Sequence, residues 1–150
     1  MKSTLIIFFV LAVGLAITCG QAFAHHGSDL SYKMDESVTV KGTVTNLRWA
    51  NPHAQLYFDE EKNGELIHWA TEMNSPGVLT RDGWTKTTIK PGDIITVTMH
   101  PSKSGDPVGL CGVIVLPDGR KVQGYTGTQK DAPPDTIRLA PVPGKTTQKK

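Results

Sequence analysis

The alternation of apolar and polar residues predicts a small β domain. In residues 38–49, Val38, Val40 and Val44 share one face of an extended chain, and threonines and a lysine occupy the other face. This two-residue period is typical of a strand with one buried face. Gly42 lies on the apolar face in the middle of the segment, which indicates a sharp bend or a bulge, as at the corner of a barrel.

Further strands follow along the chain. They are predicted at residues 54–59, 65–73, 94–100 and 110–116, with a short return strand at 120–125. Asn63-Gly64 lies between the second and third of the main segments, and both residues tolerate positive φ, so a tight hairpin is expected there. Ser75 fits the N-cap of a short helix, with Pro76 at its first position and Gly83 just beyond its end.

The order of these elements predicts an OB-like, five-stranded β-barrel. Three strands, a short helix and two more strands is the order of that fold, and a long bent first strand fits a strand shared by both halves of a closed barrel. A small open β-sandwich is the alternative that the same pattern allows. The predicted fold class is therefore all-β with one short helix.

The beginning of the chain has the features of a secretory signal peptide. Lys2 precedes an apolar stretch over residues 5–17, and the small-residue run Ala22-Phe23-Ala24 follows. This order predicts cleavage after Ala24 and export to the periplasm without a stable membrane anchor. The predicted organisation is a signal peptide at 1–24, an N-terminal arm at 25–36, the β domain at 37–125 and a disordered, proline-rich tail at 126–150.

Charge and cysteine content narrow the classes of function. The chain has a formal net charge of +2, and removal of Lys2 with the signal peptide leaves +1. Charges of both signs are interspersed, so no basic stripe supports a nucleic-acid partner. Cys19 lies in the signal peptide, which leaves Cys111 alone in an apolar segment. We expect a buried thiol and no internal disulfide.

Several short motifs occur in a specific order: HHG near the expected mature start, then VTVKGTVTNLRWANPH, NSPGVLTRDGW, KPGD and VIVLPDGRKV. Over residues 25–124 this order resembles a family of small exported bacterial proteins of uncharacterised function. The resemblance implies an exported, OB-like β protein, and it implies no enzyme activity.

The expected mature start places a histidine at the new N-terminus. The α-amine and imidazole of His25 would close a chelate around one metal ion, and His26 or His53 would supply a further nitrogen, which suits the tetragonal geometry of Cu(II). Cleavage after Ala22 would instead place His25 third, where amine, amides and imidazole also form a square-planar copper site. A terminus that carries two histidines without binding metal is the alternative.

A second class of function stays open on the barrel surface. OB barrels use exposed aromatic residues on strands two and three to stack against sugars or bases, and Arg48, Trp49 and Tyr57 form the candidate platform here. They would bind a saccharide, a peptide or a protein partner without a metal. The sequence contains no catalytic serine motif, nucleotide-binding loop or CxxC pair, so nothing in it supports catalysis.

Overall fold

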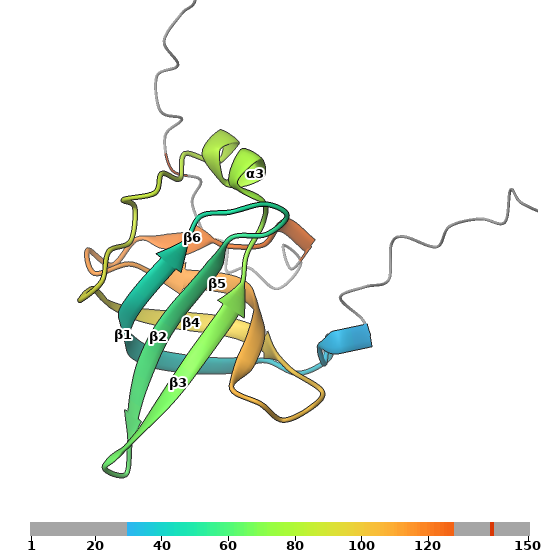
Figure 1. Cartoon of the computed structure of the whole chain (residues 1–150), viewed down its shortest axis with the longest axis vertical. Coiled ribbons are helices and arrows are strands. Elements are labelled where there is room, and N and C mark those ends of the chain that lie inside the picture. Colours follow the sequence, from blue (N-terminus) through green and yellow to red (C-terminus); the bar gives the residue numbers. More distant parts are fainter. Residues whose placement is uncertain (1–29, 128–138, 140–150) are drawn as a thin grey trace, which may run out of the picture.

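The computed structural model of the chain (Figure 1) describes residues 30–127 and Leu139. Its elements are β1 (Val38–Arg48), β2 (Gln55–Lys62), β3 (Glu65–Glu72), α3 (Pro76–Arg81), β4 (Ile94–Pro101), β5 (Val108–Val115) and β6 (Lys121–Gln123). Each predicted strand and the predicted helix is present, with ends displaced by a few residues. Among the described residues, no helix is long and apolar enough to span a membrane. The predicted signal peptide, His25, His26 and most of the predicted tail lie outside the described residues.

The strands close into a barrel. They form one sheet in the order β3-β2-β1-β4-β5-β6, and β3 also pairs with β5. This β3–β5 pairing is parallel and joins residues 70–72 to residues 108–110. Because it connects the two ends of the row β3-β2-β1-β4-β5, the five-stranded OB-like barrel is confirmed and the open sandwich is excluded. β6 extends the sheet beyond β5, outside the closed ring.

β1 takes part in both halves of the barrel. Its first part pairs with β4 and its second part with β2, and the two pairings meet at Thr43. Figure 1 shows the strand curving sharply between them. A Cβ on Gly42 would stand 2.5 Å from the carbonyl oxygen of Asp59 and 2.8 Å from Cδ2 of Phe58, so only glycine allows this close approach. The predicted bend and its cause are confirmed.

A β-bulge follows the bend and reverses the alternation of side chains. The register with β2 shifts between Val44 and Asn46, so Thr45 has no direct partner. Before the bulge the even-numbered residues face the core, as Val44 does. After it, Leu47 and Trp49 are the residues that pack against the core. One extra residue therefore changes which side chains of the following segment reach the surface.

α3 covers one end of the barrel (Figure 1). The side chain of Ser75 caps the helix by accepting a hydrogen bond from the N–H of Val78, and Pro76 occupies the first turn. Leu79 in the helix and Trp84 just after it are buried, so the chain after the helix packs back onto the domain. The core also includes Val40, Val44, Leu56, Phe58, Ile95, Val97, Ile114, Val122 and, from the predicted tail, Leu139.

We expect Gly42→Ala to destabilise the protein by roughly 1–3 kcal/mol, the usual cost of forcing extra atoms into a packed interior. The added methyl group must displace the backbone of Asp59. Gly77→Ala in α3 is the matched control, because nothing lies within 4 Å of its Cβ position. It should change the free energy of unfolding by less than about 1 kcal/mol. Urea unfolding of both variants measures this, and equal stabilities would contradict the role given to Gly42.

Candidate functional site

The described part of the N-terminal arm is held against the barrel by its backbone. The N–H of Lys33 donates to the carbonyl of Pro101 at 2.9 Å, and Tyr32 forms an antiparallel bridge with Ser102. In Figure 1 this segment, drawn in blue, lies beside the loop that joins β4 and β5. The arm therefore meets the barrel at a defined place.

Tyr32 connects the arm to the end of β3. The residue is 8% exposed, and its hydroxyl donates to Oε2 of Glu72 at 2.9 Å. Burial raises the pKa of this phenol well above its ordinary value, and the hydrogen bond to Glu72 and its negative charge raise it further. Tyr32 is thus a neutral hydrogen-bond donor at physiological pH.

The other carboxylate oxygen of Glu72 faces His53, in the loop between β1 and β2. His53 Nδ1 lies 3.0 Å from the carbonyl oxygen of Met73 and 3.3 Å from Oε1 of Glu72. Since both oxygens only accept hydrogen bonds, Nδ1 carries the proton of the neutral ring and Nε2 carries a lone pair. The side chain is 38% exposed, and its ring stacks on Tyr125 with centroids 6.2 Å apart. An imidazole held in this way by a carbonyl or carboxylate is the usual form of a metal-ligating histidine.

Gln55 brings Arg48 and Tyr57 together. Nη1 of Arg48 and the hydroxyl of Tyr57 both donate to Oε1 of Gln55, at 3.0 Å and 2.8 Å. Gln55 lies opposite Glu72 in the pairing of β2 with β3. This polar cluster is therefore adjacent to the carboxylate that supports the candidate histidine.

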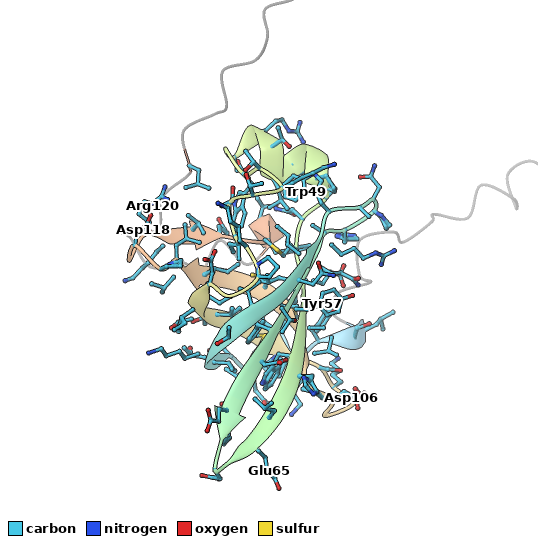
Figure 2. All side chains as sticks on the ribbon, turned by 60° about the vertical axis from the view of Figure 1, so that its left-hand side comes forward. Trp49, Tyr57, Glu65, Asp106, Asp118 and Arg120 are labelled. Carbon is cyan, nitrogen blue, oxygen red and sulfur yellow. The ribbon has the colours of Figure 1, made fainter. Side chains whose placement is uncertain are left out.

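Trp49 occupies a different place from the other two residues of the predicted platform. It is half-buried and packs against the core, because the bulge in β1 directs it inward. Figure 2 shows Trp49 close to α3 and Tyr57 farther along the sheet. The structure thus joins Arg48 to Tyr57 and separates the Trp49 ring from them, and a binding role for all three stays a prediction.

The remaining histidines of the described chain make contacts within the domain. His68 on β3 is largely exposed, and its Nδ1 lies 2.7 Å from Oδ1 of Asp59. His100 on β4 is buried, and its Nδ1 lies 2.7 Å from the carbonyl oxygen of Glu36 in the arm. In the part of the chain that the structure describes, no group of three or more histidine, cysteine or acidic residues is placed to hold a metal ion.

Cys111 is fully buried, as predicted. Burial raises the pKa of its thiol to about 12, although hydrogen bonds with Thr71 and Gly124 act in the opposite direction. The thiolate that would bind a metal or react with an electrophile is therefore scarce at neutral pH.

No local pattern in the sequence signals the residues that orient His53. His53 follows Asn51-Pro52, a turn-forming pair, and the sequence therefore predicts that it is presented at the mouth of a strand. Tyr32 and Glu72 are 40 residues apart, and their contact exists only once the barrel has closed.

These features define a class of protein: an OB-like β-barrel that presents an oriented histidine from its first loop, beside a docked N-terminal arm. The chain belongs to the family of unknown function DUF6152, which matches residues 12–111. The expected membership of an uncharacterised family is thereby confirmed. The matched stretch begins ahead of the barrel and includes His25, His26 and His53. None of the curated proteins matches the chain.

We expect Glu72→Gln to lower the pKa of Tyr32 while leaving it above the ordinary value of about 10. The substitution removes the negative charge that favours the neutral phenol, but burial, the largest cause of the shift, remains. NMR signals of isotope-labelled tyrosine rings, followed through alkaline pH, measure the change. Glu61→Gln alters an exposed carboxylate of the β2–β3 hairpin and is the control that should leave this titration unchanged. Superimposable curves for Glu72→Gln and the unaltered protein would contradict the Tyr32–Glu72 contact.

Proposed function

We propose that the protein is exported to the periplasm and that its mature form binds Cu(II) through His25 at the N-terminus and His53 on the barrel. The geometry of His53 is the observation that carries the proposal. Its Nδ1 lies against the carbonyl of Met73 and the carboxylate of Glu72, which leaves Nε2 for a metal. Imidazole nitrogen is a preferred ligand of Cu(II).

The docking of Tyr32 supports the pairing of these two histidines. Seven positions separate His25 from Tyr32, a span of at most about 25 Å when fully extended. Tyr32 and His53 share the carboxylate of Glu72, so the chain that leads to His25 starts beside the candidate ligand. A short tether of this kind holds one ligand at an effective concentration of about millimolar near the other.

The proposed ligand set consists of nitrogen atoms. His25 contributes its α-amine and its imidazole as a chelate, and His53 contributes Nε2, with His26 as the alternative source of that third nitrogen. Three nitrogens suit the tetragonal preference of Cu(II). These groups bind in their deprotonated forms, so the affinity falls at acid pH. If export cleaves after Ala22, the amine, amides and imidazole of a chain with His25 in third place form the site, and His53 is not required.

Titration of the mature chain with Cu(II) tests the proposal, once intact-mass measurement has established its first residue. Three glycines added ahead of His25 should weaken binding at least about tenfold, because they move the α-amine away from the imidazole of His25 and place neither His25 nor His26 second or third in the chain. His53→Asn should weaken binding by a similar factor. His68→Asn is the matched control, since it removes a more exposed histidine of the same barrel, and it should leave the affinity unchanged.

Equal affinity for copper in the mature chain and in all of these variants would contradict the proposal. Loss of affinity on addition of the three glycines, without any effect of His53→Asn, would assign the third nitrogen to His26. Circular dichroism of each variant separates a lost ligand from a lost fold.

The cluster of Arg48, Gln55 and Tyr57 favours a second candidate function, a metal-independent module for a saccharide, a peptide or a protein partner. The cluster combines a charged, an amide and an aromatic side chain next to one another. Gln55 and Tyr57 lie on β2, one of the strands that OB barrels use for binding. Shifts of the amide signals of these residues on addition of cell-wall saccharides or peptides, in metal-free buffer, would favour this function over the copper site.

A further inference from the structure

β3 is longer than the segment of β5 that pairs with it. β2 pairs with β3 along its whole length, but β5 pairs only with residues 70–72. Figure 1 shows the remainder of β3 running on with β2 as a hairpin beyond the body of the barrel. Residues 65–69 therefore form a strand edge that no other described strand covers.

Leu66 and His68 direct their backbone groups to this edge. The N–H of Ala70 donates to the carbonyl of Pro107, on the β5 side. Alternate residues of a strand turn their N–H and C=O to the same edge, so Leu66 and His68 point the same way as Ala70. Pro107 has no N–H, so the ladder with β5 cannot continue toward His68.

The uncovered edge has few of the features that usually keep strand edges from pairing. Residues 65–69 contain no proline, no lysine and no bulge, and their one carboxylate, Glu65, lies at the end of the edge. Leu66 lies within this edge and is 61% exposed. The formal net charge of the chain is only +2, so the long-range repulsion between copies is small.

We propose that this edge pairs with the same edge of a second copy of the chain, antiparallel about a twofold axis at Leu66. The N–H of Leu66 in each copy then donates to the C=O of Leu66 in the other, and Glu65 lies opposite Ile67 of the other copy. No like charges lie directly opposite each other in this register, and the two Glu65 side chains are diagonal neighbours about 7–8 Å apart. A contact of this kind uses the same surface on both copies and closes as a dimer.

The position of β5 favours a twofold axis at Leu66 over one at Ile67. An axis at Ile67 would form a longer ladder, but it would bring Gly64 of one copy level with Ala70 of the other, where Pro107 already accepts the N–H. With the axis at Leu66, Gly64 of one copy is level with His68 of the other, so the paired segment ends before Ala70. Because the paired segments are short, the association is weak and depends on concentration.

Sedimentation velocity and amide hydrogen exchange of the purified, metal-free protein test the pairing, from about 10 µM to about 1 mM. With rising concentration, the sedimentation coefficient should increase and the amide of Leu66 should exchange severalfold more slowly. Leu66→Lys places two like charges at the axis and should abolish both effects. Ile94→Lys, at a residue of β4 that is 57% exposed, is the matched control and should leave both effects unchanged.

Both substituted side chains are exposed, so both variants are expected to fold. A protein that stays monomeric over the whole range would overturn the proposal, as would a dimer that persists in Leu66→Lys. Equal loss of association in the two variants would place the contact on the outer face of the sheet and would also overturn pairing at the β3 edge. None of these outcomes depends on copper.

Discussion

The parallel pairing of β3 with β5 is the constraint on which the rest of the molecule depends. It is short, residues 70–72 against residues 108–110, yet it turns an open row of strands into a barrel. It also places Glu72 where the arm and the first loop reach β3, so that one carboxylate contacts both Tyr32 and His53. The pairing stops at Pro107 because proline has no N–H to extend a ladder. The β3–β5 pairing therefore closes the barrel around its core, supports His53 through Glu72, and leaves the edge of residues 65–69 uncovered.

The fold could be predicted because local patterns specify its elements. Gly42 interrupts the apolar face of a long strand, and the structure bends there. Asn63 and Gly64 both have positive φ, 55° and 82°, as a tight hairpin requires. Ser75 and Pro76 begin the short helix in the expected way. With these elements placed, the order of strands and helix favours an OB-like barrel, and the β3–β5 pairing of the structure excludes the open sandwich.

The candidate site was less predictable because it depends on contacts between distant residues. The bulge at Thr45 has no signature in the sequence, yet it decides that Trp49 packs against the core. Tyr32 and Glu72 meet across 40 positions, and neither belongs to a motif. His53 could be selected from its place after a turn. The position of the proton on Nδ1 of His53 could not be predicted, because it depends on a hydrogen bond to the backbone carbonyl of Met73 at the end of β3.

The central claim is that the barrel holds His53 with its proton on Nδ1 and with Nε2 free to bind a metal. The proposed copper chemistry depends on this tautomer, since a ring nitrogen that carries a proton offers no lone pair to a metal. Heteronuclear NMR of the metal-free, nitrogen-labelled protein distinguishes the two neutral tautomers by the chemical shifts of their ring nitrogens. At about pH 8, above the usual titration range of imidazole, the Nδ1–H form should dominate at His53. A dominant Nε2–H form would contradict the account.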